Sequence, residues 1–144
     1  RYDATQDQIG WNRAGFDDSG WDAATEVEAP HVAVVAQDVE PNIASQVVKP
    51  VGVETLADGS FLVDMGTSMT GWAVVRLPHE LPRGTEVRME YVDSRDGDAL
   101  QTYNQRDEYV AGGGDSECFR SRFSYHGFRW IRITGLSKAL AVNL

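Results

Sequence analysis

The sequence predicts an all-β fold, built as an antiparallel sandwich or barrel. Apolar residues alternate with polar ones at a period of two in several segments, whereas no segment shows the 3.6-residue period of an amphipathic helix. Turn residues recur at a spacing of roughly 8–12 residues, which is typical of sandwiches and barrels. The chain of 144 residues is long enough for one domain with its own hydrophobic core.

The first part of the chain differs from the rest. Residues 1–30 are rich in Gly, Asp, Asn and Trp and poor in β-branched residues, which predicts loops. A short apolar run at residues 31–37 is the first candidate strand, and Pro41 indicates a bend after it. We therefore divide the chain into a loop-rich segment at residues 1–38 and an antiparallel β-sandwich at residues 39–144.

The strands of the predicted sandwich are separated by turn residues. An Asp-Gly pair at residues 58–59 is typical of a tight hairpin turn. The clearest strand is predicted at residues 86–93, where Val87, Met89 and Tyr91 would face the core and the charged residues between them would face solvent. The other candidate strands are residues 61–65, 72–77, 102–111, 119–125, 128–133 and 139–144.

Composition excludes several classes of protein. The formal net charge is −9, which argues against nucleic-acid binding, because binding to phosphates needs clustered Lys and Arg. No apolar run approaches the roughly 20 residues of a membrane span, and no signal-peptide pattern is visible. With a single cysteine, Cys118, the sequence can form neither an internal disulfide nor a cysteine-based zinc site.

The positive charge gathers near the end of the sequence. Residues 118–144 hold five basic residues and no acidic ones. One interpretation is that these strands lie beside acidic strands and balance their charge. A second is that they form a docking face for another domain. Nucleic-acid binding is the weakest of the three interpretations.

Candidate catalytic groups are few. Glycoside hydrolysis needs two carboxyl groups on opposite sides of a cleft, roughly 5–9 Å apart. Asp107 and Glu108 cannot form such a pair, because neighbours on a strand point to opposite faces. The pairs 17–18 and 90/93 remain candidates for a small hydrolase. The three histidines have no metal-type spacing.

The loop-rich segment contains a candidate carbohydrate site. Aromatic rings with planar polar side chains suit the C–H face and the hydroxyls of a sugar. The alternative is that the aromatic residues cover the edge of the sandwich. The aspartates of this segment are candidate ligands for a calcium ion, although no EF-hand spacing is present. The candidate sugar-binding residues are Trp11, Asn12, Asp17, Asp18 and Trp21.

Several motifs resemble those of one enzyme family. At the start of the chain, Gly15-Phe-Asp-Asp-Ser-Gly-Trp21 resembles the end of the N-terminal module of bacterial α-L-rhamnosidases (glycoside hydrolase family 78). The later motifs are more specific and resemble the concanavalin-like β-sandwich of the same enzymes. They are Phe61-Leu-Val-Asp-Met-Gly66, Met69-Thr-Gly-Trp72, Gly84-Thr-Glu-Val-Arg-Met-Glu-Tyr91, Asp107-Glu-Tyr109 and Arg122-Phe-Ser-Tyr-His-Gly-Phe-Arg-Trp130.

The resemblance implies a jelly-roll or concanavalin-like sandwich without catalytic residues of its own. In this family the catalytic acids lie on a separate (α/α)-barrel domain, so the chain would be an accessory region that packs on that barrel and contacts glycan. The alternative is a stand-alone carbohydrate-binding module for glycans containing L-rhamnose. We expect no cofactor and no nucleic-acid or membrane partner, and a secreted or periplasmic location is favoured over a cytoplasmic one. The interdomain face is predicted at Tyr125, His126, Phe128, Arg129 and Trp130.

Overall fold

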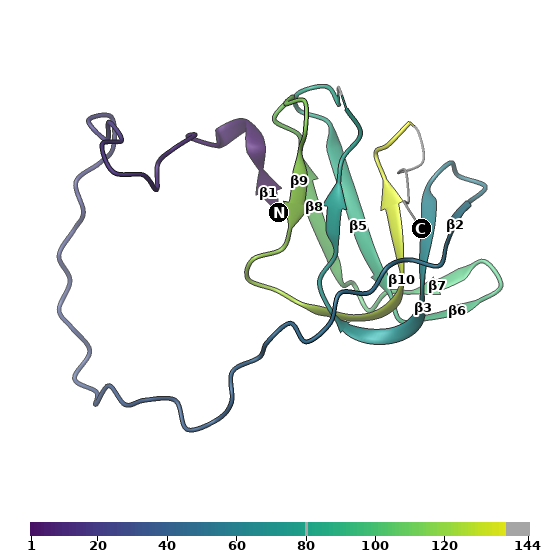
Figure 1. The fold of residues 1–144 in the computed structure, drawn as a ribbon, viewed down its shortest axis with the longest axis horizontal. Coiled ribbons are helices and arrows are strands. Elements are labelled where there is room, and N and C mark those ends of the chain that lie inside the picture. The colour runs from purple at the N-terminus through teal and green to yellow at the C-terminus, as the bar shows by residue number, and fades with distance from the viewer. Residues whose placement is uncertain (80, 138–144) are drawn as a thin grey trace. The chain divides into compact units, whose positions relative to one another are not determined.

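The computed structural model describes residues 1–79 and 81–137, shown as ribbons in Figure 1. The chain divides into two compact units. The sandwich unit consists of Arg1–Asp7 and Gln46–Leu144, and the N-terminal unit consists of Gln8–Ser45. Within the described ranges, no helix is long and apolar enough to cross a membrane. The domain boundary between residues 38 and 39 stays a prediction.

The N-terminal unit is a chain of turns and irregular segments. Its residues 31–37, predicted as a strand, belong to no sheet, so that prediction is wrong. Val32, Val34 and Val35 are 69%, 98% and 78% exposed. A strand is stable only when a neighbouring strand pairs with its backbone groups, and an apolar run does not supply that neighbour.

The sandwich unit contains short and long strands and one 3-10 helix, η1 (Ala4–Gln6). The longest strands, β3 and β10, lie side by side near the middle of the larger sheet. The strands are β1 (Tyr2–Asp3), β2 (Gly52–Thr55), β3 (Phe61–Gly71), β4 (Val74–Arg76), β5 (Glu86–Val92), β6 (Ser94–Asp96), β7 (Ala99–Gln101), β8 (Arg106–Val110), β9 (Cys118–Arg120) and β10 (His126–Thr134).

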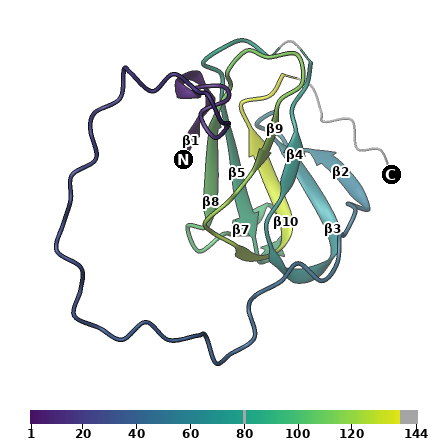
Figure 2. The same ribbon diagram turned by 60° about the vertical axis from the view of Figure 1, so that its left-hand side comes forward.

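Two layers make the sandwich. The larger sheet has the strand order β1-β8-β5-β10-β3-β2, and a second sheet consists of β4 and β9. Figure 2 shows β4 and β9 on one side of the larger sheet. Neighbouring strands are antiparallel, except that β1 runs parallel to β8. The strands β6 and β7 form a separate hairpin. The predicted antiparallel β-sandwich is therefore confirmed.

The core lies between the two sheets. In β5, Val87, Met89 and Tyr91 are fully buried, as the alternating pattern predicts. Val75 of β4 and Phe119 of β9 close the same apolar cluster from the second sheet. Fully burying side chains of this size is worth about 1.5–3 kcal/mol each relative to exposure, so this cluster is the main source of stability.

The first residues of the chain belong to the sandwich. Tyr2 stacks on Tyr109 of β8 with parallel rings whose centroids are 5.9 Å apart. The guanidinium of Arg83 donates to the carbonyl oxygen of Thr5 at 2.7 Å and to that of Gly112 at 3.0 Å. These contacts attach β1 and η1 to the edge of the larger sheet.

Three predicted strands are shorter than the pattern indicated. The strand predicted at residues 72–77 consists only of Val74–Arg76. The strand predicted at residues 119–125 ends at Arg120, and Phe123 is fully exposed. The strand predicted at residues 102–111 begins only at Arg106, because Tyr103 and Asn104 adopt positive φ angles of 48° and 60° and form a turn. The strand predicted at residues 139–144 lies outside the described residues.

Candidate functional site

The residues proposed for sugar binding lie in the N-terminal unit. Trp11 and Trp21 are 56% and 49% exposed. The ring of Trp21 packs against Phe16 with centroids 5.6 Å apart, and its indole N–H donates to Gln8 Oε1 at 2.6 Å. Asn12 is exposed as well. Both indoles therefore present surface to solvent, and Trp21 is held by local contacts.

The aspartates of this unit act locally. Asp17 Oδ1 accepts a hydrogen bond from the backbone N–H of Ser19 at 3.0 Å, and hydrogen bonds from Ser19 hold the pKa of Asp17 below its usual range. This is the common Asx-turn role of an aspartate before a glycine turn. Asp18 is exposed. Across residues 1–79 and 81–137, no three His, Cys, Asp or Glu side chains gather as metal ligands would.

The structure distributes the residues of the predicted interdomain face over different surroundings. Tyr125 is 57% exposed, whereas Phe128 is 2% exposed and belongs to the core. The ring of His126 stacks on buried Tyr91 at a centroid distance of 4.0 Å. The guanidinium of Arg129 lies over the indole of Trp130, 4.4 Å from the ring centroid. His126 and Phe128 both pack on Tyr91, whereas Arg129 and Trp130 contact each other.

Several apolar side chains are exposed near the ends of β3, β4 and β9. Of these, the sequence analysis predicted only Tyr125 as part of an interaction surface. His126 of β10 pairs with Gly71 of β3, which brings Tyr125 close to Trp72. We call Trp72, Val74, Phe123 and Tyr125 the apolar rim; they are 37%, 57%, 100% and 57% exposed. Exposed apolar residues at such strand ends are candidates for an interaction surface.

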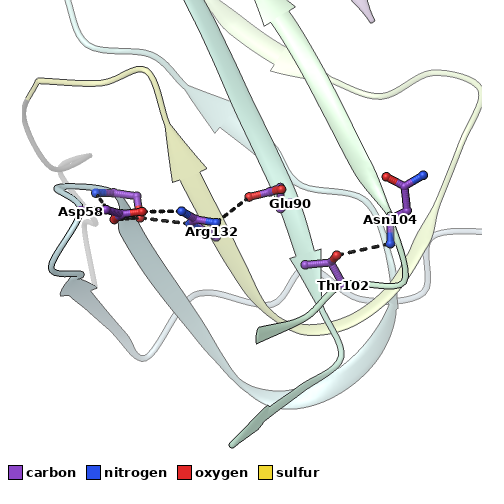
Figure 3. A network of polar contacts seen from close by, with 6 residues as sticks. Asp58, Glu90, Thr102, Asn104 and Arg132 are labelled. Atoms are coloured by element: carbon purple, nitrogen blue, oxygen red, sulfur yellow. Dashed lines mark hydrogen bonds and ion pairs between the residues drawn. The ribbon is translucent and has the colours of Figure 1, made fainter. Parts of the chain in front are cut away.

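Ion pairs cover the outer face of the larger sheet, the face turned away from β4 and β9. Figure 3 shows Arg132 between Asp58 and Glu90. Its guanidinium donates to Asp58 Oδ2 and, at 3.2 Å, to Glu90 Oε2. These contacts are part of the charge balance expected of the basic final strands. Hydrogen bonds from Ser60, together with Arg132, lower the pKa of Asp58 to about 2.

This network makes the stability of the folded chain depend on pH in the acidic range. Because the pKa of Asp58 is lower in the folded state than in the unfolded chain, its contribution is complete above about pH 4 and is lost as the pH falls towards about 2. We expect Asp58→Asn to lower the melting temperature at pH 6, measured by circular dichroism. Between pH 6 and pH 2.5, the melting temperature of the variant then falls by less than that of the unsubstituted chain. An equally steep acid transition in the variant would contradict this role.

Three carboxylates of the sandwich already have hydrogen-bond or ion-pair partners. Asp107 is buried and accepts the hydroxyl of Tyr91 at 2.8 Å. Glu108 points to the opposite face and pairs with Arg88 at 3.1 Å. Glu90 is bound by Arg132. These three carboxylates are therefore held by partners within the sandwich.

Comparison with known protein families accounts for both parts of the chain. Residues 54–144 match the family model described as the bacterial alpha-L-rhamnosidase concanavalin-like domain. Residues 1–46 match the alpha-L-rhamnosidase N-terminal domain. The chain belongs to the bacterial α-L-rhamnosidase family. The rhamnosidase resemblance and the concanavalin-like sandwich expected from the motifs are thereby confirmed.

Individual rhamnosidases resemble the chain over nearly its whole length. An α-L-rhamnosidase of Streptomyces avermitilis is 32% identical over an alignment of 142 positions, which covers 93% of this chain and 14% of that protein. One from Formosa agariphila is 30% identical, covering 94% of this chain and 15% of that protein. The chain therefore spans about one-seventh of the length of these relatives.

Solved structures agree with the sequence matches. The structure of the α-L-rhamnosidase from Dictyoglumus thermophilum superposes with a TM-score of 0.89 at 28% identity, covering 98% of this chain and 16% of that one. The Streptomyces avermitilis α-L-rhamnosidase complexed with L-rhamnose gives a TM-score of 0.86 at 31% identity, covering 98% and 14%.

Proposed function

We propose that the chain is a non-catalytic β-sandwich region of an α-L-rhamnosidase and that it packs against the catalytic domain. One observation carries this proposal. The chain aligns with rhamnosidases along nearly all of its own length, but the alignment covers only 14–16% of the length of those proteins. The engagement of Glu90, Asp107 and Glu108 within the sandwich supports a role without chemistry.

The apolar rim supports packing on another domain. Its four side chains project from the ends of β3 and β4 and from the segment before β10. Burying them would remove exposed apolar surface from water, which is favourable by about 25 cal/mol per Å². Tyr125 belongs both to the rim and to the face predicted from the sequence. We therefore place the domain contact at the rim, with Tyr125 near its centre.

A chimera tests this proposal. In the Streptomyces avermitilis relative, the matching segment is replaced by this chain, and hydrolysis of p-nitrophenyl α-L-rhamnoside is measured. We expect the chimera to be active and the isolated chain to be inactive, because the chain corresponds to only 14% of the relative's length and the described carboxylates Glu90, Asp107 and Glu108 are held by partners within the sandwich. Turnover by the isolated chain would contradict the non-catalytic role.

The rim is tested within the same chimera. We expect Phe123→Ser combined with Tyr125→Ser to lower its melting temperature, whereas the same changes in the isolated chain leave its melting temperature nearly unchanged, because both side chains are exposed there. An exposed substitution outside the rim, Glu40→Ser, serves as the control. Equal melting temperatures for the chimera and its rim variant would place the domain contact elsewhere.

Carbohydrate binding by the N-terminal unit is a second candidate function. The half-exposed indoles of Trp11 and Trp21 favour it, with Asn12, Asp17 and Asp18 as neighbouring polar groups. Titration with L-rhamnose would then change tryptophan fluorescence, and Trp11→Phe would abolish the change. A response that survives Trp11→Phe and Trp21→Phe together would exclude this unit as its source.

A further inference from the structure

The outer face of the larger sheet contains a shallow concavity beside Trp130. Its volume is about 230 Å³, and its lining includes Gly52, Glu54, Leu62, Arg95 and Trp130. The strands β2, β3 and β10 contribute to it, together with Arg95 of the β6–β7 hairpin. It lies on the side of the sheet opposite the core, so the packing of β4 and β9 does not fill it.

A missing side chain explains the hollow. Gly52 of β2 is opposite Asp64 of β3, and Asp64 is opposite Trp130 of β10. Directly opposed residues in antiparallel strands share a face, so these three positions lie in a row on the outer face. A Cβ added to Gly52 would meet no atom within 4 Å. Because Gly52 has no side chain, the outer face is open at this position, and the space lies in the same row as Asp64 and Trp130.

The floor of the concavity is apolar and firmly held. Leu62 is only 2% exposed and is not part of the cluster between the two sheets. Val92, which is opposite Trp130 on β5, is fully buried as well. The guanidinium of Arg129 stacks on the indole and is itself held by both oxygens of Asp64. Trp130 is thus fixed in one orientation at the edge of the hollow.

Two ion pairs form polar walls. Arg95 donates to both oxygens of Glu54, at 2.6 and 3.2 Å. Arg129 donates to both oxygens of Asp64, each at 3.2 Å. Asp64 Oδ1 also accepts the backbone N–H of Gly66 at 2.7 Å, so its two lone pairs are used. Asp64 Oδ2 and both oxygens of Glu54 each accept one guanidinium hydrogen bond and keep a lone pair that can accept a hydroxyl proton. Holding polar groups in place before binding reduces the entropic cost of binding a ligand.

The charge of the walls selects the class of ligand. Two carboxylates and two guanidinium groups sum to zero formal charge, so the site favours neither an anion nor a cation. A fixed indole beside an apolar floor suits the C–H face of a sugar ring, and planar donors and acceptors around it suit hydroxyl groups. A neutral compound with an apolar face and several hydroxyls fits these features together.

We propose that this concavity is a binding site for one neutral pyranose unit of a glycan, stacked against Trp130 and hydrogen-bonded by Glu54, Asp64 and Arg95. All residues that line the concavity belong to the sandwich unit. Because the concavity is shallow, we expect dissociation constants near the millimolar range for monosaccharides, which corresponds to weak binding.

The test is an NMR titration of the intact chain, following the indole N–H resonances. The probes are L-rhamnose, D-glucose and D-galactose as neutral pyranoses, and inorganic phosphate as an anion. We expect at least one neutral sugar to shift the Trp130 resonance saturably, with little effect from phosphate. No saturable shift at Trp130 with any of the three sugars up to about 100 mM, or saturable phosphate binding there, would overturn the proposal.

A matched pair of variants locates the binding. Gly52 has an ordinary φ angle and open space around it, so Gly52→Leu fills the concavity without removing a contact. We expect it to weaken binding by about tenfold or more while leaving the melting temperature nearly unchanged. Gly71→Leu, at another strand glycine with open space, is the control and leaves binding intact. Unchanged affinity in Gly52→Leu would place the sugar elsewhere and overturn the site.

Discussion

Replacing Gly135 with alanine is expected to unfold the sandwich or to leave it barely stable. Gly135 follows β10 with a φ angle of +88°, and an added Cβ would lie 1.9 Å from the carbonyl oxygen of Glu86. The left-handed conformation costs a non-glycine residue about 1–3 kcal/mol, and overlap with backbone adds about 1–3 kcal/mol or more. Relief would require β10 and β5 to separate at the centre of the sheet.

The measurement is thermal and urea unfolding by circular dichroism. A loss of at least about 3 kcal/mol, from a total of about 5–15 kcal/mol for a domain, lowers the melting temperature by about 10 °C or more. Gly127→Ala is the matched control, because Gly127 lies within β10, the strand that Gly135 follows, with an ordinary φ angle and no atom within 4 Å of an added Cβ. Similar unfolding curves for the two variants would show that β5 can shift at little cost.

Nothing in the sequence around Gly135 separates it from Gly127. Both glycines follow an apolar or aromatic residue by one or two positions, and the close approach to Glu86 comes from a strand 49 residues earlier in the chain. Local patterns predict which residues of one strand share a face, as they do for Val87, Met89 and Tyr91. They do not predict how near two backbones come, because that distance depends on the order of strands in the sheet.

The same reasoning separates the confirmed predictions from the wrong ones. The alternation of residues 86–93 was sufficient because β8 and β10 pair with its backbone and the second sheet covers its apolar side. The run at residues 31–37 is also rich in valine and alanine, but it has no neighbouring strand. At residues 119–125 the alternation continued beyond Arg120, yet the pairing with β4 ended there, which left Phe123 in solvent. In each of these three segments, the presence of a neighbouring strand decided whether the predicted strand formed, and the apolar pattern alone did not.

The concavity beside Trp130 also depended on pairing. The sequence indicated that Trp130 was functional, but as part of a docking face with Tyr125 and Phe128. The structure instead brings it into one row with Asp64 and Gly52, from strands that are far apart in the chain. Gly52 belongs to a strand that the periodicity did not predict, because Gly52–Thr55 is too short to show alternation. Rows of this kind become visible only once the register of the sheet is known.

Tyr91→Phe is expected to destabilise the sandwich by about 1–3 kcal/mol, although it removes a single oxygen atom. The hydroxyl of Tyr91 donates to Asp107 Oδ2 at 2.8 Å in the buried core. Burial and the neighbouring Asp107 raise the pKa of Tyr91 well above its usual value, so the hydroxyl remains a donor at any ordinary pH. Loss of the hydroxyl removes this donor from the buried carboxylate of Asp107.

Tyr109→Phe provides the comparison that isolates this effect. Tyr109 is 5% exposed and donates to Glu117 at 2.8 Å, so the two substitutions remove the same group from similarly buried rings. Glu117, however, also accepts hydrogen bonds from the backbone N–H groups of Gly112 and Gly114, and it keeps these when the tyrosine hydroxyl is gone. We therefore expect Tyr109→Phe to lose only about 0.5–1.5 kcal/mol.

Urea unfolding of both variants at pH 7 decides between two accounts of the core. If the orphaned carboxylate of Asp107 sets the cost, Tyr91→Phe is the more destabilising change, and a further Asp107→Leu substitution recovers part of the loss, because it removes the unpaired charge. If His126, whose Nε2 lies 3.4 Å from Asp107 Oδ2, donates to Asp107 in place of the lost hydroxyl, the two variants are equally stable. Equal stabilities would mean that Asp107 is not dependent on Tyr91, and that the buried polar group is held by the histidine instead.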